Sequence, residues 1–181
     1  TVVAVGAQDQ KIAAYGAGIS EGAATLSLGT AGAIEFLASE RGGVLPAFPF
    51  IDGRRVVMEG CVNTFGAAIN WARDLLTPSE GYAEWNNLAA SAPIGSHGAV
   101  FRPFLSGAGT PHEGAELAGS WEGLTLHTGK SEMARAVYEG LACEIRLNVD
   151  AAREASVRVE ALRAFGGGTG SSLLLQMIAN L

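Results

Sequence analysis

The chain has 181 residues, enough for one domain with a single hydrophobic core and too few for two large lobes. Hydrophobic residues make up 48% and charged residues 17%, which excludes a disordered chain, and the net charge of −6 argues against nucleic acid or anionic lipid as a partner. No apolar run approaches the roughly 18 residues that cross a bilayer, and no basic segment precedes one as in a signal peptide, so we expect a cytoplasmic protein.

Two residue types are informative by their number. Cys61 and Cys143 are the two cysteines, far apart and without a C-x-x-C pattern, which argues against a disulfide framework or structural zinc. We expect both thiols to be buried. The 25 glycines cost backbone entropy, so we expect them in tight turns, in close packing or where the backbone approaches a ligand.

The N-terminal part of the chain predicts a strand, a helix and a hairpin. Residues 1–5 form a β-branched run that ends at Gly6, and the apolar stretch 12–19 has helical character. Residues 25–30 and 33–37 then resemble two short strands joined by a glycine turn. The economical interpretation is a β-hairpin.

The middle of the chain predicts two helices and an extended segment. Apolar residues from position 63 onward recur at helical spacing until Pro78 ends the pattern. A second, shorter helix is expected over 84–91. Residues 99–105 are apolar but are interrupted by Arg102 and Pro103, which favours an edge strand or an extended segment.

The C-terminal part predicts a helix, a strand and a further helix. Residues 131–155 carry one apolar face and form the longest predicted helix, and 157–165 follow as a strand. The last helix is expected over 171–181 and still continues at the final residue. Because the chain also starts without Met, we expect it to be a fragment. The alternation of strands and helices indicates an α/β architecture.

Three glycine-bearing turns follow predicted strands, at residues 6–10, 27–32 and 165–172. Such turns let backbone N–H groups point at an anion, and together they suggest a nucleotide site. Taken singly, each is more often only a tight turn. The last turn lacks the lysine of a P-loop and the downstream acidic residue of a dinucleotide-binding fingerprint, which counts against both of those classes.

Asp9 is the only acidic residue among the first twenty positions. A carboxylate at this place can take a proton from a substrate hydroxyl as a general base. An aspartate there is also a routine N-cap for the helix that follows, and the local evidence favours the cap.

The order of the segments resembles the C-terminal, nucleotide-binding domain of the FGGY family of carbohydrate kinases, in particular its xylulokinase-like members. The segments that carry the resemblance are GAQDQ at 6–10, AAYGAG at 13–18, SLGTAG at 27–32, FPFIDG at 48–53, EG at 59–60, WARDLL at 71–76, FLSGAGTPH at 104–112, GLTLHT at 123–128, ARAVYEGLA at 134–142 and FGGGTGSSLLLQMIANL at 165–181. They span nearly the whole chain in order, which makes them more specific together than any one motif.

The resemblance implies a ribonuclease H-like α/β fold of the actin and sugar-kinase superfamily, with a mixed sheet flanked by helices. It implies that residues 1–181 are the C-terminal lobe of an enzyme that uses ATP to phosphorylate a hydroxyl of a ketopentose such as xylulose, or of a related sugar or polyol. The partners would be the sugar, ATP and an N-terminal sugar-binding lobe, with a homodimer left open. The isolated lobe is expected to be inactive.

The resemblance also assigns roles to individual residues. Asp9 is implied as the catalytic base and a substrate contact. Gly29 and Thr30 would lie against the terminal phosphates. The remaining nucleotide contacts would be Gly166, Gly167 and Gly168 along the α-phosphate and ribose, and Ser172 and Gln176 beside the adenosine. Mg2+ would bridge the β- and γ-phosphates, and no residue is assigned to a protein metal site.

Some features depart from the family pattern and keep alternatives open. Gln8 replaces the small residue usual before the aspartate, and the segment ending in His112 lacks the Glu and Arg of the family motif. We expect His112 to be structural, and Trp71, Trp85 and Trp121 to be packing residues. One alternative is a non-catalytic nucleotide-binding or regulatory module of the same superfamily. A nicotinamide-dependent oxidoreductase is another, and the late position of the glycine triplet counts against it.

Overall fold

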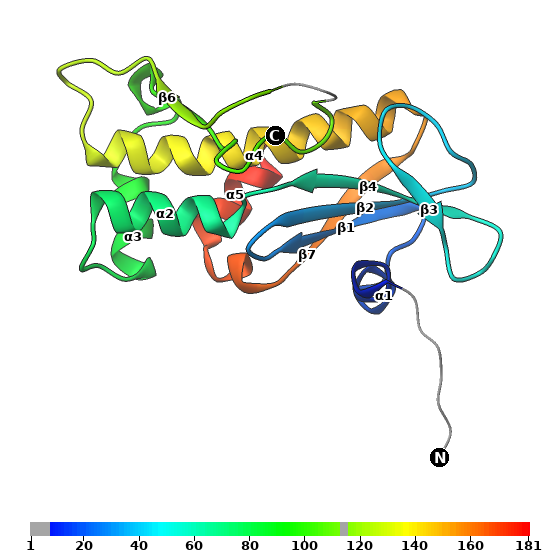
Figure 1. The fold of residues 1–181 in the computed structure, drawn as a ribbon. Helices are drawn as coiled ribbons and strands as arrows, with labels where there is room; N and C mark the ends of the chain where they lie inside the picture. The colour runs from blue at the N-terminus through cyan, green and yellow to red at the C-terminus, as the bar shows by residue number, and fades with distance from the viewer. Residues whose placement is uncertain (1–7, 113–115) are drawn as a thin grey trace.

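The computed structural model describes residues 8–112 and 116–181, in which a five-stranded mixed sheet forms the centre (Figure 1). The strand order is β3-β4-β2-β1-β7, and β7 runs parallel to β1 whereas the other neighbours are antiparallel. The strands of this sheet are β1 (Gly22–Leu28), β2 (Gly32–Ala38), β3 (Ala47–Pro49), β4 (Val56–Val62) and β7 (Val159–Phe165). A separate two-stranded sheet pairs β5 (Val100–Arg102) with β6 (Ser120–Glu122).

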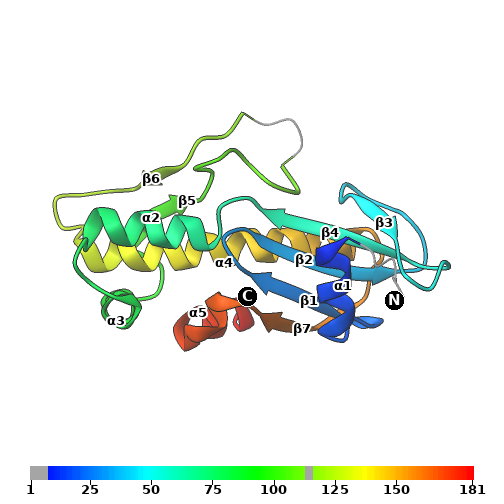
Figure 2. The same ribbon diagram turned by 60° about the horizontal axis from the view of Figure 1, so that its bottom comes forward.

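Helices lie on both faces of the sheet. They are α1 (Asp9–Gly16), α2 (Gly66–Leu76), α3 (Tyr82–Ser91), α4 (Lys130–Glu154) and α5 (Ser172–Ala179), with short 3-10 turns η1 (Ser96–Gly98) and η2 (Gly167–Gly170). The long helix α4 covers one face and α1 lies on the other (Figures 1 and 2). Because α4 extends past the end of the sheet, α2 and α3 pack against its projecting half. No helix in the described ranges is long and apolar enough to span a membrane.

The structure confirms most of the predicted elements. The hairpin is formed by β1 and β2, and α2, α3, α4 and β7 begin and end within a few residues of the predicted bounds. The extended segment over 99–105 becomes β5. Three strands were not predicted, namely β3, β4 and β6, and α5 ends at Ala179 instead of continuing to the last residue. The strand and turn predicted over 1–6 lie outside the described residues.

The hydrophobic core lies between the sheet and α4. Side chains of Leu26, Phe36 and Met58 from the sheet meet Leu141 and Ile145 from α4, and all are essentially inaccessible to solvent. The central strands are buried on both faces, so they form continuous apolar runs with little alternation.

Some of the expected buried residues lie at the surface. Trp85 is fully buried, as predicted for a packing residue. Trp71 is 44% exposed and stacks on Trp121 of the two-stranded β5–β6 sheet at a ring separation of 5.3 Å. Cys143 lies on the solvent side of α4, so the prediction that both thiols are buried is wrong for this one, while Cys61 is partly buried.

A polar network attaches the segment before residue 113 to α4 and β4. The buried Asn148 side chain donates to the Thr110 carbonyl at 2.8 Å and to the Glu144 carbonyl at 2.9 Å, and accepts from the Thr110 hydroxyl at 2.7 Å. The Cys61 N–H donates to that hydroxyl at 2.6 Å. A side chain at Gly60 would overlap Asn148, so this close packing requires glycine in the strand.

Replacing Asn148 by Ala is expected to lower the free energy of unfolding by about 2–3 kcal/mol, because buried carbonyl groups lose their donor. Urea denaturation of the chain measures this change. Asn87→Ala is the matched control, since Asn87 is an exposed residue of α3, and its effect should stay within about 0.5 kcal/mol. Equal effects of the two substitutions would contradict the assigned role of Asn148.

Helix α1 is attached to the sheet by a buried ionic cluster. The Lys11 ammonium group lies 3.0 Å from a Glu35 carboxylate oxygen of β2 and also contacts the Glu59 carboxylate of β4. It lies 4.5 Å from the centre of the Phe48 ring. A small apolar cluster, to which Ala14 contributes from α1, packs beside it. The helix is therefore fixed by one buried cation shared between two carboxylates.

Burial of Glu35, opposed by its contact with Lys11, raises the pKa of its carboxyl group from the usual 4.5 to about 7. The folded chain then binds more protons than the unfolded chain between these values, so stability should fall as pH rises from about 4.5 to 7. Glu35→Gln removes this titration and should flatten the dependence, as measured by urea denaturation from pH 5 to 8. Exposed Glu40→Gln is the control. Identical pH slopes for wild type and Glu35→Gln would contradict the assignment.

Candidate functional site

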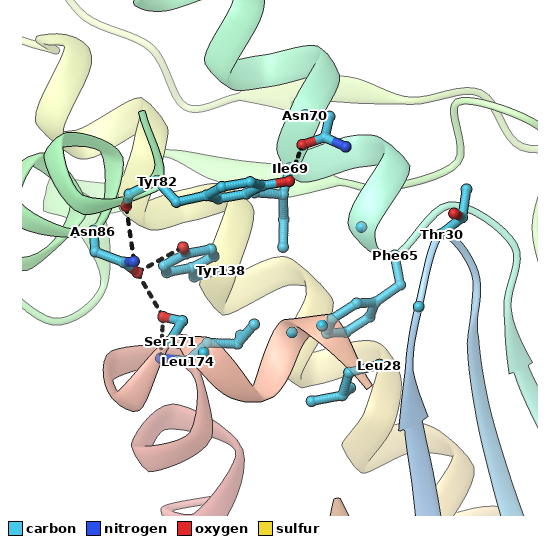
Figure 3. A pocket seen from close by; sticks show the side chains of 15 residues that line it. Leu28, Thr30, Phe65, Ile69, Asn70, Tyr82, Asn86, Tyr138, Ser171 and Leu174 are labelled. Carbon is cyan, nitrogen blue, oxygen red and sulfur yellow. Dashed lines mark hydrogen bonds between the residues drawn. The ribbon is translucent and has the colours of Figure 1, made fainter. Parts of the chain in front are cut away.

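A pocket of about 420 Å³ opens where the end of β1 meets α2, α3, η2 and α5 (Figure 3). The lining residues are Leu28, Gly29, Thr30, Phe65, Gly66, Ile69, Asn70, Tyr82, Asn86, Tyr138, Gly167, Gly168, Gly170, Ser171 and Leu174. None of these side chains carries a formal charge at neutral pH. An anionic ligand in this pocket would therefore be held by backbone N–H groups and hydroxyl groups.

The loop between β1 and β2 forms one end of the pocket and is held by α2. The Gly66 N–H donates to the Gly29 carbonyl at 3.0 Å, and the Ala67 N–H donates to the Thr30 carbonyl at 3.1 Å. A Cβ at Gly66 would lie 2.6 Å from the Gly29 oxygen, so only glycine allows this approach. The loop carbonyls are thus turned toward the N-terminus of α2, whose dipole places partial positive charge at this end of the pocket.

The glycine turn after β7 forms a second wall. Gly166 has a φ of +94°, a conformation that glycine adopts without strain, and a Cβ there would lie 2.9 Å from the Leu28 carbonyl. A Cβ at Gly168 would lie 2.7 Å from the Leu28 side chain. At Gly167, by contrast, no atom lies within 4 Å of the added Cβ. Two of the glycines are required by the fold, and Gly167 leaves open space beside the pocket.

Aromatic side chains line the end of the pocket away from the β1–β2 loop (Figure 3). The Asn86 side chain joins them, because its oxygen accepts from the Tyr138 hydroxyl at 2.8 Å and from the Ser171 hydroxyl at 2.5 Å. Its amide donates to the Tyr82 carbonyl at 2.8 Å. Burial raises the pKa of the Tyr138 hydroxyl, which keeps it protonated as the donor. The wall therefore combines aromatic ring faces with hydrogen-bonded polar groups, which suits a planar ring with polar edges.

The structure brings together four of the residues expected to bind nucleotide. Gly29, Thr30, Gly167 and Gly168 all line the pocket. Gly166 lies directly behind it, against Leu28. Ser172 and Gln176 do not line the pocket, because α5 begins at Ser172 and both side chains are exposed. Ser171, the N-cap of α5, takes that place instead.

The pocket residues that the sequence did not identify come from β1, the segment before α2, the helices α2, α3, α4 and α5, and the turn before α5. Phe65 and Ile69 belong to the apolar pattern of α2, and Tyr138 to the apolar face of α4, so they carry the same signal as core residues. Tyr82 and Asn86 lie on a short helix with no motif of their own. These side chains can be recognised as pocket residues only in the folded structure, where they lie side by side.

Asp9 lies at the first residue of α1 and is exposed. The N-cap position is occupied by Gln8, so the interpretation of Asp9 as the N-cap is wrong. Its carboxylate accepts a hydrogen bond from the Gln10 N–H at 2.8 Å. Asp9 does not line the pocket, and its role as base stays a prediction.

His112 has structural partners. Its Nε2 lies 2.8 Å from a Glu144 carboxylate oxygen, and its ring meets Phe104 edge-on at 5.1 Å. Burial raises the pKa of the Glu144 carboxyl group. These contacts agree with the structural interpretation of His112 made from the sequence.

Among residues 8–112 and 116–181, no three His, Cys, Asp or Glu side chains gather in a way that would hold a metal ion. Mg2+ commonly binds through one or two carboxylates and the phosphates of a substrate, without a dedicated cage of side chains. The pocket itself supplies no carboxylate, so an ion there would be held by the phosphates of the nucleotide and by groups from outside the pocket.

Comparison with protein families finds a match over residues 24–181 to the model described as the FGGY family of carbohydrate kinases, C-terminal domain. The chain is 31% identical to a xylulose kinase of Staphylococcus epidermidis over 99% of its own length and 37% of that relative. It is 38% identical to a glycerol kinase of Gloeobacter violaceus over 68% of its length and 25% of that relative. The chain therefore spans well under half of the curated relatives that it matches.

Solved structures show the same fold. The xylulose kinase of Rhodospirillum rubrum superposes with a TM-score of 0.86 and 28% identity, over 94% of this chain and 36% of that one. The glycerol kinase of Plasmodium falciparum with ADP gives a TM-score of 0.78 at 22% identity, over 94% and 36%. These neighbours confirm the predicted α/β fold of the actin and sugar-kinase superfamily.

Proposed function

The chain belongs to the FGGY family of carbohydrate kinases, as its C-terminal domain, and from this premise we propose that it supplies the ATP site and the catalytic base of a sugar kinase. The acceptor is a hydroxyl of a ketopentose such as xylulose, or of a related sugar or polyol. Relatives named xylulose kinase and glycerol kinase support this class of acceptor. The rest of the enzyme, with most of the sugar contacts, is an N-terminal lobe.

In the proposed reaction, Asp9 accepts the proton of the sugar hydroxyl while the sugar oxygen forms a bond to the γ-phosphorus. The bond between that phosphorus and the bridging oxygen breaks, and ADP leaves with the electron pair. Phosphoryl transfer of this kind depends mainly on positioning and charge stabilisation. Gly29 and Thr30 line the pocket beside the N-terminus of α2, and in this proposal their loop holds the terminal phosphates, with the Thr30 hydroxyl as a donor.

The observation that carries the proposal is the construction of the pocket. One end is a glycine loop held by the N-terminus of α2, and the other is the aromatic wall around Asn86. This arrangement suits a ligand with an anionic end and a planar end, as in a nucleoside triphosphate. Mg2+ held by the phosphates would supply further neutralisation of their charge.

ADP release by the full-length enzyme tests the proposal. With ATP, Mg2+ and a panel of pentoses, hexoses and polyols, at least one acceptor should raise ADP release far above the sugar-free rate. Xylulose and glycerol are the first two acceptors to compare. Binding of ATP with no acceptor-dependent ADP release would instead favour the non-catalytic nucleotide-binding module.

A further inference from the structure

The direction of the Asp9 carboxylate depends on how α1 is rotated about its own axis. In a helix each residue turns by about 100°, so residues two apart project from nearly opposite sides. Lys11 points into the protein and is buried, and Asp9 is exposed. The contact made by Lys11 therefore determines which way Asp9 points.

Lys11 is held by three partners, one on each of the strands β2, β4 and β3. Its ammonium group pairs with Glu35 of β2 at 3.0 Å, contacts Glu59 of β4 and lies over the ring of Phe48. The β2 and β4 partners lie opposite one another in the sheet register, so the lysine is held at one fixed point of the sheet. Ala14 is the other buried residue of α1, one turn further along.

An ammonium group so deeply buried is costly to desolvate, and replacing such a pair by apolar groups is often neutral or stabilising. Stability alone is therefore a weak reason for the cluster. A charge shared between two strands does fix one orientation of a short helix, because any rotation of α1 would separate the charges. The eight-residue helix begins at the proposed base, which makes that orientation relevant to the reaction.

We propose that Lys11 is a positioning residue for phosphoryl transfer, which anchors α1 to Glu35 and Glu59 and thereby directs the Asp9 carboxylate toward the sugar hydroxyl. This inference rests on the proposed function. Lys11 does not line the nucleotide pocket, so it acts on the rate of transfer and not on ATP binding.

The test uses full-length enzyme in which the cluster is neutral, Lys11→Met with Glu35→Gln and Glu59→Gln. Removing Lys11 alone would leave the buried Glu35 and the partly buried Glu59 without their cation and would favour unfolding, whereas the triple variant leaves no charge in the cluster. We expect it to fold, to keep the KM for ATP within about twofold and to lose about 10- to 100-fold in kcat through misplacement of the base. Lys130→Met, at an exposed lysine, is the matched control and should keep wild-type kcat.

A double-mutant cycle with Asp9→Asn identifies the route of the effect. If Lys11 acts through Asp9, the triple substitution should lower kcat no further once Asp9 is replaced. Multiplying losses, or a folded triple variant with wild-type kcat, would overturn the proposal.

Amide hydrogen exchange gives a readout that does not depend on activity. The amides of α1 should exchange faster in the triple variant while β1 and β2 keep their protection. Unchanged exchange in α1 would overturn the anchoring role. A wild-type enzyme without sugar-dependent ADP release would refute the proposed function itself, and the exchange result decides the anchoring of α1 separately.

Discussion

Replacing Asp9 by Asn in the full-length enzyme is expected to lower kcat for sugar phosphorylation by about 10²- to 10⁴-fold, the usual contribution of a general base. The asparagine has nearly the same shape, and its side-chain oxygen can still accept the Gln10 N–H, so α1 should begin as before. Because Asp9 does not line the nucleotide pocket, the KM for ATP should change little. Steady-state ADP release with a saturating acceptor measures both constants.

Asp74→Asn is the control for this experiment. Asp74 is an exposed residue of α2 that pairs with its neighbour Arg73, and the substitution should leave kcat unchanged. The melting temperatures of both variants should stay close to that of the wild type. A kcat near the wild-type value in Asp9→Asn would remove Asp9 as the base while leaving the nucleotide pocket intact as a prediction.

The elements predicted correctly are those whose local pattern agrees with their burial. In α4, one apolar face repeats over 25 residues, which gives an unambiguous helical period. The β1–β2 hairpin combines two apolar runs with a glycine turn. In both cases the residues that are apolar in the sequence pattern are the ones that the folded chain buries.

Strand β4 could not be predicted because the residues at its centre break the apolar pattern of a buried strand. Its centre contains Glu59, Gly60 and Cys61, which interrupt the apolar run that marks a buried strand. In the structure Glu59 contacts Lys11, and Gly60 allows the side chain of Asn148 to approach. These contacts come from segments distant in sequence, so no local pattern could reveal them.

The candidate site was predictable only in part, for a similar reason. The glycine turns carry a local signal because their backbone conformations demand glycine, as at Gly166. The aromatic wall has no such signal. Tyr82 and Asn86 lie one turn apart on α3, and Asn86 meets Tyr138 of α4 through a hydrogen bond between residues 52 apart in sequence. The resemblance assigned Ser172 to the nucleotide, whereas its neighbour Ser171, the N-cap of α5, lines the pocket.

Replacing Gly66 by Ala is expected to weaken ATP binding about 10- to 100-fold, because the methyl group would lie 2.6 Å from the Gly29 carbonyl oxygen. The β1–β2 loop must move to relieve this overlap, which breaks the hydrogen bonds that orient it. The free energy of unfolding should also fall by about 1–3 kcal/mol. Without this overlap the substitution would instead raise the free energy of unfolding, since alanine is the better helix former by about 1 kcal/mol.

Gly42→Ala is the matched control for this substitution. Gly42 lies in the connection after β2, and a Cβ there would meet only the Ala155 side chain at 3.8 Å and its carbonyl at 3.9 Å, both ordinary van der Waals distances. Calorimetric titration with ATP and Mg2+ should give wild-type affinity for this control. Wild-type affinity in Gly66→Ala would mean that the loop held by α2 does not contact the phosphates. Reduced affinity with unchanged kcat at saturating ATP would place the loop in binding, separate from the proton transfer assigned to Asp9.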